Sequence, residues 1–271
     1  MKILQINTVC DVGSTGRTTR ELAEFLEANG HECYVAYGHG TTTWHRSTKI
    51  GGKWENHFHN AFFTRLLGLH GYGTHYGTRK LIKWIMEIKP DVVHLQNLHG
   101  NYLNYPIGFN VLVERQIPVV FTLHDCFNYT GKCSHYTAQG CYRWKDECHD
   151  CPLIHTTAPS MFFDFSNKIF IEKETSYKEM KNLTVVAVSR WLANEAMQSR
   201  LFRSARKVTH IYNWIDYDKF HRATQEEIDA FCVKYHLSRD CKYLISVSQG
   251  WHNNAPRYKD ALALAKKLPS D

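Results

Sequence analysis

Four cysteines near the middle of the sequence have the residue type and spacing of a metal site. Cys133, Cys141, Cys148 and Cys151 form the pattern C-x7-C-x6-C-x2-C. A C-x2-C pair lets one turn supply two ligands, and a structural zinc ion takes four such ligands in a tetrahedron. The pattern therefore predicts a closed, structural zinc site, and buried free thiols are the alternative.

The stretch 126–159, which carries these cysteines, has no regular pattern of apolar residues. It is too long for an ordinary loop and therefore needs a source of order of its own. Since it contains few apolar residues, we expect metal binding to fold it.

His124 and Asp125 directly follow an apolar run at 119–123. A histidine at the end of a strand can orient a hydroxyl or phosphate group of a substrate, and a neighbouring aspartate can fix its tautomer or bind an acceptor substrate itself. The sequence contains 17 histidines, so a structural role is the alternative for any one of them. We take His124 and Asp125 as the candidate catalytic pair.

A turn that contains two glycines follows the first apolar run of the chain. Gly13, Ser14, Thr15 and Gly16, followed by Arg17, separate this run from a helical pattern. The glycines allow a tight turn, and free N–H groups at the start of a helix bind anions. The third glycine of the dinucleotide motif G-x-G-x-x-G is missing. The motif predicts an anion site, and a plain strand–helix turn with Ser14 or Thr15 as N-cap is the alternative.

Short apolar runs alternate with longer amphipathic segments along most of the chain. The apolar runs predict strands at 2–7, 32–37, 91–95, 118–123, 183–188, 208–212 and 242–247. The amphipathic segments predict helices at 16–28, 56–69, 77–88, 105–115, 226–235 and 258–268. This alternation predicts the α/β class, with a Rossmann-like parallel sheet that helices cover on both faces.

Polar residues gather where the predicted strands end. Besides the glycine turn and His124, they include Asn97, Ser189, Arg190 and Asn213. The carboxyl ends of parallel strands meet at one edge of a sheet, where ligands of such folds bind. We therefore expect an active site along this edge.

Composition restricts the class of protein. The chain has 271 residues, of which 43% are hydrophobic and 22% are charged, and its formal net charge is +7. These values are typical of a globular protein with a sizeable core. The basic residues are scattered and form no known nucleic-acid motif, so we expect no nucleic acid partner.

The sequence shows no sign of a membrane-spanning helix or a secretory signal. No apolar stretch approaches the ~20 residues of a spanning helix, and no secretory signal is visible, so we expect a cytoplasmic protein with reduced cysteines. The predicted helix at 56–69 carries an apolar stripe formed by Trp54, Phe58, Phe62, Leu66 and Leu69. Such a stripe favours a helix face in the core. Peripheral contact with a membrane surface is the alternative.

Two domains are expected. Residues 1–216 contain enough strands and helices for a complete Rossmann-like domain, with 126–159 as an insertion. Residues 217–271 restart the strand–helix alternation but contain one strand only, which cannot close a core. We therefore expect an incomplete second Rossmann-like domain at 217–271.

Several motifs resemble glycosyltransferase family 4. They are the segments 1–6, 30–32, 90–96, 187–192 and 210–216, together with Phe220. The segment 121–125, followed by the four cysteines, is similar to a subgroup that makes bacterial capsule, exopolysaccharide or O-antigen chains. The resemblance covers essentially the whole chain and implies the GT-B architecture, in which an acceptor domain precedes a donor domain.

This resemblance implies a retaining transfer of a sugar from a nucleotide-sugar donor to a glycan acceptor, here lipid-linked, at the inner face of the membrane. It places His124 and Asp125 near the transferred sugar. It implies substrate or phosphate binding by Gly13, Ser14, Thr15, Gly16, Arg17, Asn97, Ser189, Arg190, Asn213 and Lys259. The family's design needs no catalytic metal, so zinc would be architectural.

The sequence departs from the family pattern at the donor side. Trp214 stands where the family usually has glycine, and 248–251 lacks an arginine that binds the donor diphosphate in many members. The family's E-x7-E motif would lie beyond Asp271, so the resemblance implies a C-terminally truncated chain that is inactive alone. A GT-B sugar-nucleotide epimerase and a non-catalytic, acceptor-binding remnant are the alternatives.

Overall fold

The structure is a computed structural model that describes residues 1–245, 247 and 256–267. The chain divides into two compact units, Met1–Asn213 and Trp214–Asp271, and each is considered by itself. The predicted boundary after residue 216 lies three residues further along the chain.

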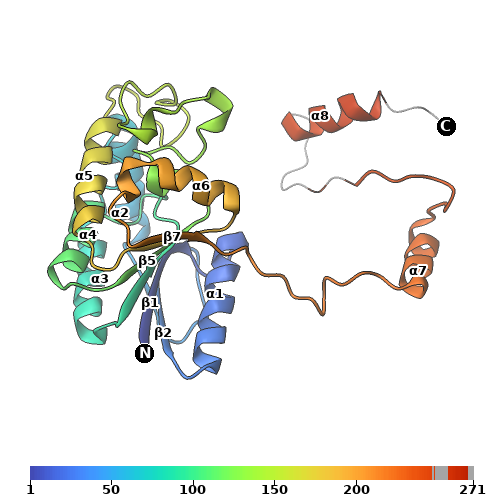
Figure 1. The fold of residues 1–271 in the computed structure, drawn as a ribbon, viewed down its shortest axis with the longest axis horizontal. Coiled ribbons are helices and arrows are strands. Elements are labelled where there is room, and N and C mark those ends of the chain that lie inside the picture. Colours follow the sequence, from blue (N-terminus) through green and yellow to red (C-terminus); the bar gives the residue numbers. More distant parts are fainter. Residues whose placement is uncertain (246, 248–255, 268–271) are drawn as a thin grey trace. The chain divides into compact units, whose positions relative to one another are not determined.

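The first unit is built on seven strands, all parallel, in the order β3-β2-β1-β4-β5-β6-β7 (Figure 1). The strands are β1 (Lys2–Val9), β2 (Glu32–His39), β3 (Ser47–Lys49), β4 (Val92–Leu95), β5 (Val119–Leu123), β6 (Thr184–Ala187) and β7 (Lys207–His210). The predicted α/β class with a Rossmann-like parallel sheet is therefore confirmed.

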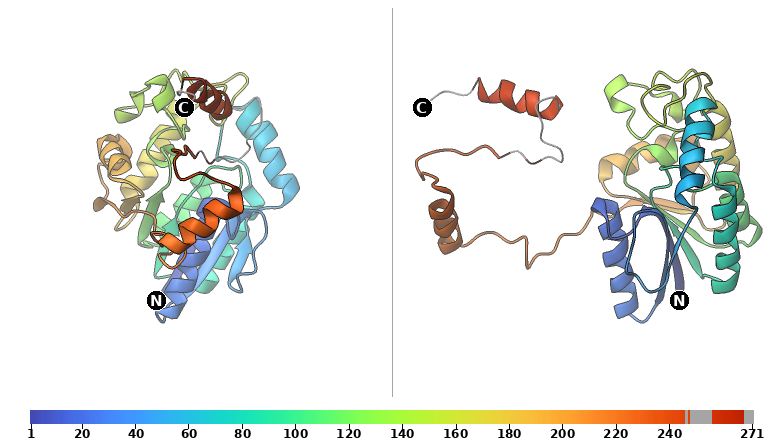
Figure 2. Two further views of the ribbon diagram at one scale, coloured as in Figure 1. Left: turned by 90° about the vertical axis from the view of Figure 1, so that its right-hand side faces the viewer. Right: turned by 180° about the vertical axis from the view of Figure 1, so that it is seen from behind.

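Helices cover both faces of this sheet. Figures 1 and 2 show α1 (Gly13–Ala28) on one face and α3 (His75–Ile88), α4 (Tyr105–Glu114) and α5 (Ser166–Glu179) on the other. A further helix, α6 (Arg190–Gln198), packs against β6 and β7. The sequence analysis missed α5, α6 and β3. The α5 sequence is mostly polar and has only a weak apolar period, whereas α6 and β3 are short.

Two-sided cover explains why the strands are apolar on both faces. Leu4, Val93, Val119, Phe121 and Val185 are completely buried. Burial of one such side chain contributes about 1.5–3 kcal/mol to folding. Polar residues in these strands are therefore costly except near the carboxyl ends, where the chain leaves the sheet.

The order of the strands reverses between β1 and β4. From β1 the chain moves outward through β2 to β3, and from β4 it moves the other way through β5 and β6 to β7. In open parallel sheets, ligands bind outside the carboxyl ends of the strands at this switch point. The fold thus places the loops after β1 and β4 on either side of the expected site.

The apolar stripe on the helix after β3 is exposed, and its predicted place in the core is wrong. This helix begins as α2 (Lys53–Phe58) and continues as a π-helix, η1 (His59–Leu66). Trp54 is 84% exposed and Phe58 56% exposed, whereas the buried residues are Asn56, His59 and Thr64. Because π-helical hydrogen bonds join residues five apart instead of four, an α-helical period no longer identifies the buried face.

The insertion at 126–159 has an aromatic core, contrary to the expectation that it contains few apolar residues. It forms the short 3-10 helices η2 (Phe127–Tyr129), η3 (Thr137–Gln139) and η4 (Arg143–Lys145). Trp144 is buried, with its ring centroid 4.9 Å from that of Tyr129 and 5.0 Å from that of Tyr136. Aromatic pairs at this separation contribute about 0.5–1.5 kcal/mol beyond burial of their area.

The second unit contains α7 (Gln225–Tyr235) and α8 (Pro256–Ala265). A capping box starts α7, with Thr224 and Glu227 each accepting a backbone hydrogen bond from the other. The predicted strand at 242–247 is absent at 242–245 and 247, and residue 246 lies outside the described residues. A strand needs a hydrogen-bonded neighbour, and the described part of this unit offers none. No helix in the described part of the chain is long and apolar enough to span a bilayer.

We expect limited proteolysis to remove the second unit first. No residue of α7 is buried, whereas the core clusters of buried side chains lie within Met1–Asn213. Exposed backbone is the preferred site of cleavage. Mass spectrometry should show a stable fragment that ends near residue 213. Equal survival of both units would contradict the division.

Stability should fall as the pH is lowered below about 6.5. Burial lowers the pKa of His59 to about 3 and lowers the pKa of His70 well below its usual value. Both are neutral when folded but bind a proton when unfolded, so the unfolded state gains up to about 1.4 kcal/mol per pH unit for each histidine. Urea unfolding at pH 7 and pH 5 measures this loss.

The matched pair of variants for this measurement is His59→Gln and His45→Gln, because His45 is exposed. Only His59→Gln should reduce the dependence of the unfolding free energy on pH. An equal reduction in both variants would show that His59 is not the source.

Candidate active site

The glycine turn after β1 has the strained geometry that its residues allow. Asp11 and Gly13 have φ values of +67° and +69°, and the Asp11 N–H donates to the carbonyl of Gly16 at 3.1 Å. A Cβ on Gly16 would lie 3.1 Å from Val9 Cγ2 and 3.3 Å from the Asp11 nitrogen, so the turn leaves little room for a side chain there. This close approach seats α1 on the end of β1.

The N-cap of α1 is Val12, which makes no side-chain cap. The alternative in which Ser14 or Thr15 caps the helix is therefore wrong. Ser14 and Arg17 are exposed at the first turn of the helix, and Thr15 is half-buried. The first N–H groups of α1 consequently have no capping side chain at position 12.

A buried chain of side-chain hydrogen bonds ends at His124. Gln5 Nε2 donates to the Thr19 carbonyl at 3.1 Å, and Gln96 Nε2 donates to Gln5 Oε1 at 2.8 Å. Gln96 Oε1 lies 3.1 Å from His124 Nε2. A carbonyl oxygen can only accept a hydrogen bond. The Thr19 carbonyl therefore fixes which atom donates at each step of this series of hydrogen bonds, and it makes His124 Nε2 the donor to Gln96. Neutral His124 therefore has its acceptor lone pair on Nδ1.

The protonation of His124 reflects two opposing effects. Burial lowers the pKa of His124, the charge of Asp125 raises it, and the lowering prevails. At neutral pH the imidazole is therefore uncharged, as a group that accepts a proton must be.

Asp125 pairs with His99 and not with His124. Asp125 Oδ2 lies 2.9 Å from His99 Nε2, and Asp125 Oδ1 accepts from the Phe127 N–H at 2.8 Å. Burial acts to raise the pKa of Asp125, but the hydrogen bond and charge of His99 outweigh it and lower the pKa. The suggestion that Asp125 fixes the tautomer of His124 is therefore wrong, since Gln96 does so.

His99 was not among the residues that the sequence singled out. The sequence indicated His99 only through its position in the polar run 96–101 after β4. No spacing between motifs linked His99 to Asp125. Parallel pairing of β4 with β5 brings the two together across the carboxyl edge. Only the register of the sheet could have identified this pair.

Hydrogen bonds tie the loops together across the switch point. Thr8 Oγ1 donates to the carbonyls of Asn97 and His99 at 3.0 and 2.6 Å. Asn7 Oδ1 accepts from the Asn97 N–H at 3.1 Å, and the Tyr102 hydroxyl donates to the Asn97 carbonyl at 2.8 Å. The predicted residue Asn97 thus uses its backbone to position the loop that carries His99.

An open cavity of about 490 Å³ lies beside this edge, between the end of β2 and the α2–η1 helix. Lys49 and Lys53 contribute ammonium groups and Trp54 contributes an exposed ring. The amides of Asn56, Asn60 and Asn101 and the imidazoles of His39 and His57 also line it. The cavity therefore offers donors, acceptors and an apolar surface to a polar ligand.

The remaining predicted residues have different surroundings. Ser189 Oγ accepts from the Leu192 N–H at 3.1 Å and so caps α6, while Arg190 is exposed on its first turn. Asn213 is exposed at the end of the first unit, and Lys259 is exposed on α8 of the second unit. Ser189 therefore has a structural task, and these four residues share no hydrogen bond with the His124 network in the described structure.

The four cysteines line one cavity of about 20 Å³ within the insertion. Figure 1 shows this segment above the carboxyl ends of the strands. Among the described residues, no group of three or more His, Cys, Asp or Glu side chains lies close enough together to hold a metal ion. The four cysteines therefore line one cavity, but their side chains are not close enough together to coordinate a metal ion.

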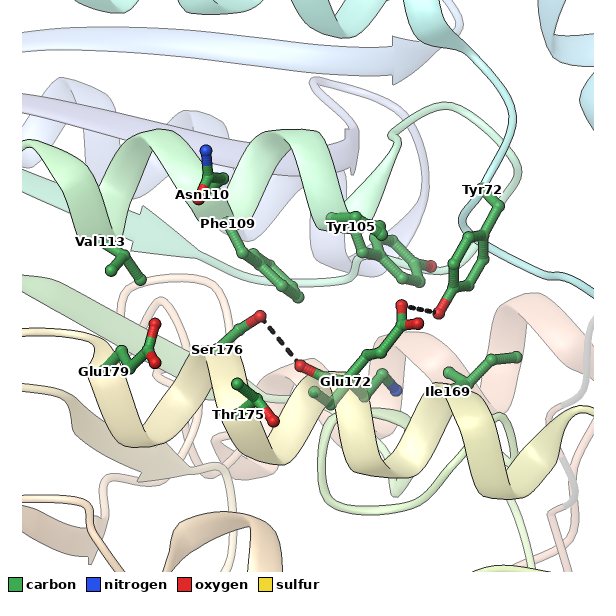
Figure 3. A pocket seen from close by; sticks show the side chains of 12 residues that line it. Tyr72, Tyr105, Phe109, Asn110, Val113, Ile169, Glu172, Thr175, Ser176 and Glu179 are labelled. Carbon is green, nitrogen blue, oxygen red and sulfur yellow. Dashed lines mark hydrogen bonds between the residues drawn. The ribbon is translucent and has the colours of Figure 1, made fainter.

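Another cavity, of about 400 Å³, lies between α4 and α5 (Figure 3). There the Tyr72 hydroxyl donates to the Glu172 carboxylate, and Ser176 Oγ donates to the Glu172 carbonyl. Its lining, as far as the described residues go, includes no residue that the sequence predicted for the site. This cavity lies where α4 packs against α5, and it is separate from the His124 network.

Replacing Asp125 by asparagine should lower the pKa of His124. The Asp125 charge raises that pKa, so its removal leaves burial unopposed, with a shift of up to about one unit. NMR titration of the His124 imidazole, assigned with His124→Gln, measures the shift. Asp150→Asn, at an exposed carboxylate, is the matched control. A rise in the pKa of His124 in Asp125→Asn would contradict the electrostatics described here.

Comparison with solved structures finds a UDP-GlcNAc 2-epimerase from Neisseria meningitidis bound to UDP-GlcNAc. Its TM-score is 0.39 and its sequence identity 9%, and the match covers 77% of this chain and 45% of that chain. The present chain therefore spans less than half the length of this structure. No curated protein matches the sequence.

Comparison with protein families gives a more extensive match. Residues 15–219 match the family described as Glycosyltransferase Family 4. This range includes most of α1, His124 with its partner Gln96, the His99–Asp125 pair, the cysteine insertion and α6. It covers well over half of the chain, which therefore belongs to Glycosyltransferase Family 4.

Proposed function

We propose that this protein transfers a sugar, with retention, from a nucleotide-sugar donor to a hydroxyl group of a glycan acceptor in the synthesis of a bacterial surface polysaccharide. Residues 1–216 form the acceptor side of a GT-B enzyme and 217–271 begin its donor side. The observation that carries the proposal is the gathering of His124 and the His99–Asp125 pair at the carboxyl edge, next to the cavity at Trp54.

The acceptor side of the reaction needs a group that orients a hydroxyl. Neutral His124, with its Nε2–H held by Gln96, presents Nδ1 as an acceptor for such a hydroxyl. The adjacent Asp125 carboxylate, whose pKa is lowered, favours developing positive charge at the sugar ring. The cavity at Trp54 supports an acceptor subsite, because a ring face and several amides suit the apolar and polar faces of a sugar.

The donor side of the reaction must stabilise a leaving diphosphate. The N-terminus of α1 at Gly13–Gly16 offers backbone N–H groups, and Arg17 adds a cation on its exposed turn. Arg190 and Lys259 are further cations that we assign to phosphate binding, with Asn97 and Asn213 as polar contacts. This chemistry requires no metal ion, because positive groups of the protein meet the charge.

A lipid-linked acceptor would bring the enzyme to the membrane surface. The exposed stripe of α2 and η1 lies beside a second exposed apolar segment that contains Met161 and Phe162. The two are joined by the Met161 N–H, which donates to the Arg65 carbonyl at 2.7 Å. Apolar side chains next to Lys53 and Arg65 are typical of a peripheral contact with an anionic bilayer. The proposed location is therefore the inner face of the cell membrane.

The 271-residue chain alone should show no appreciable transfer, since the family grips the donor mainly with the second domain. Each lost charge-assisted hydrogen bond costs about 1.5–3 kcal/mol, so losing two or three reduces the rate by roughly a hundredfold or more. The assay compares this chain with one in which a complete donor domain follows residue 216, with the same donor and acceptor. A comparable rate for both would contradict the assignment of donor binding to the second domain.

In the longer form, His124→Ala should abolish transfer while donor binding is retained. His45→Ala, at an exposed histidine outside the His124 network, is the matched control and should keep the rate. Loss of donor binding in His124→Ala would refute the acceptor-side role of His124. Equal rates in both variants would do the same.

A further inference from the structure

The cavity beside Trp54 has positive charge in its lining and no carboxylate. Lys49, the last residue of β3, and Lys53, the first residue of α2, both line it. No Asp or Glu is among the described residues around this cavity. Its volume of about 490 Å³ is within the range of about 300–1,000 Å³ that is typical of pockets for organic ligands. The cavity therefore suits an organic ligand that carries negative charge.

The carboxylate nearest to these lysines in the sequence faces another helix. Glu55 Oε1 accepts from the Tyr76 N–H at 2.7 Å, and Glu55 Oε2 accepts from the Gly77 N–H at 3.1 Å. These bonds hold the charge of Glu55 at the first turn of α3, where a helix N-terminus stabilises it. None of the ion pairs among the described residues involves Lys49 or Lys53.

The two ammonium groups have donors to offer a ligand. Lys49 Nζ donates to the Gly40 carbonyl at 2.9 Å, which uses one of its three N–H groups. Lys53 Nζ makes no hydrogen bond to another described residue, and both side chains are exposed. Most of the N–H groups of the two lysines are therefore open to a ligand.

Hydrogen bonds orient the amide of Asn60. The Thr64 hydroxyl donates to Asn101 Oδ1, and Asn101 Nδ2 donates to Asn60 Oδ1 at 3.3 Å. Asn101 makes these bonds from a left-handed backbone with a φ of +60°, which asparagine tolerates better than most residues. Asn60 thus uses its oxygen within the protein, and its Nδ2 is left as a donor in the lining of the cavity.

The side-chain oxygens of the described lining already accept hydrogen bonds. They belong to Asn56, Asn60 and Asn101. Asn56 Oδ1 accepts from the Thr74 hydroxyl at 3.4 Å, and Asn56 Nδ2 donates to the Gly38 carbonyl at 3.3 Å. The lining therefore offers mainly donors. An oxyanion matches it, because an oxyanion only accepts hydrogen bonds and binds charged donors most strongly.

The loop that carries His99 forms one wall of the cavity. Gly100 and Asn101 directly follow His99 in the sequence, and both line the cavity. His39 Nε2 donates to the Gly100 carbonyl, and Thr8 Oγ1 donates to the His99 carbonyl at 2.6 Å. A ligand in the cavity therefore contacts the loop that brings His99 to the candidate active site.

We propose that this cavity binds a sugar unit of the acceptor that carries an oxyanion, either a carboxylate or a phosphate. The ammonium groups of Lys49 and Lys53 and the amide of Asn60 bind the oxyanion, and the exposed Trp54 ring packs against the sugar. The inference rests on the proposed function for the statement that the acceptor is a glycan, and it adds that the glycan is acidic. A neutral sugar gains nothing from the two charges, so the cavity selects acceptors by charge.

Binding to the unaltered 271-residue chain tests this inference without a transfer assay. The probes are glucuronic acid, glucose 6-phosphate and glucose, which have the same sugar ring and differ in charge. NMR titration of the Trp54 indole N–H, assigned with Trp54→Phe, measures each Kd. At least one anionic sugar should bind about tenfold more tightly than glucose. High salt should remove the difference, because it screens exposed charges. Equal affinity for all three sugars would overturn the proposal.

Variants locate the anion. Lys49→Gln and Lys53→Gln should each weaken binding of the preferred anionic sugar by about tenfold and leave the affinity for glucose unchanged. Lys80→Gln, at an exposed lysine of α3 that is outside the lining, is the matched control and should bind both sugars like the parent protein. Unchanged affinity for the anionic sugar in Lys49→Gln and Lys53→Gln would overturn the proposal.

Two further probes test other sources of negative charge. Inorganic phosphate should bind more weakly than the preferred anionic sugar, because it has no ring to pack against Trp54. Vesicles that contain phosphatidylglycerol should not displace that sugar. Tighter binding of inorganic phosphate, or displacement by the vesicles, would show that the cavity takes a free ion or a lipid headgroup and would overturn the proposal.

Failure of this inference and failure of the proposed function give different results. A chain that prefers the anionic sugar, while its longer form transfers no sugar, supports the charged subsite and contradicts the transferase proposal alone. A longer form that transfers equally well to neutral and acidic acceptors, with Lys53→Gln as active as the parent, contradicts the charged subsite alone.

Discussion

The bond between Gln5 and Gln96 is the interaction on which the candidate site depends. It joins two completely or almost completely buried amides across β1 and β4, where the strand order reverses. A buried amide without partners would cost several kcal/mol, so both side chains must stay in one orientation. The Thr19 carbonyl sets that orientation and Gln96 passes it to His124. A catalytic tautomer is thus fixed from within the core.

The same edge of the sheet combines rigid backbone with titratable side chains. Thr8 and Asn7 bind the loop that carries His99, and β5 presents His124 and Asp125 beside it. Burial holds His124 neutral, whereas Asp125 keeps its charge through its bond to His99. A neutral imidazole beside an ionised carboxylate combines a proton acceptor with a fixed negative charge, which acid–base and electrostatic catalysis use. The two side chains differ because the His124 imidazole bonds to the Gln96 amide, whereas the Asp125 carboxylate bonds to the His99 imidazole.

The cysteine insertion is ordered by aromatic packing. The rings of Tyr129, Tyr136 and Trp144, packed edge-on or tilted against one another, give it a core, which continues into that of the sheet. The four thiols line a small cavity together with Lys132, Tyr136 and Trp144. Aromatic packing therefore gives the insertion a core of its own, directly after the segment that carries His124 and Asp125.

The sequence by itself determined the α/β class, most strands and helices, and the edge of the sheet where the polar residues gather. Apolar periodicity carries this information because burial on both faces demands it. Only tertiary structure decided that His99, and not His124, pairs with Asp125, and that Gln5 and Gln96 fix the tautomer, because partners far apart in sequence meet through strand register. It also exposed the stripe at Trp54, since a π-helical turn changes which residues face the core.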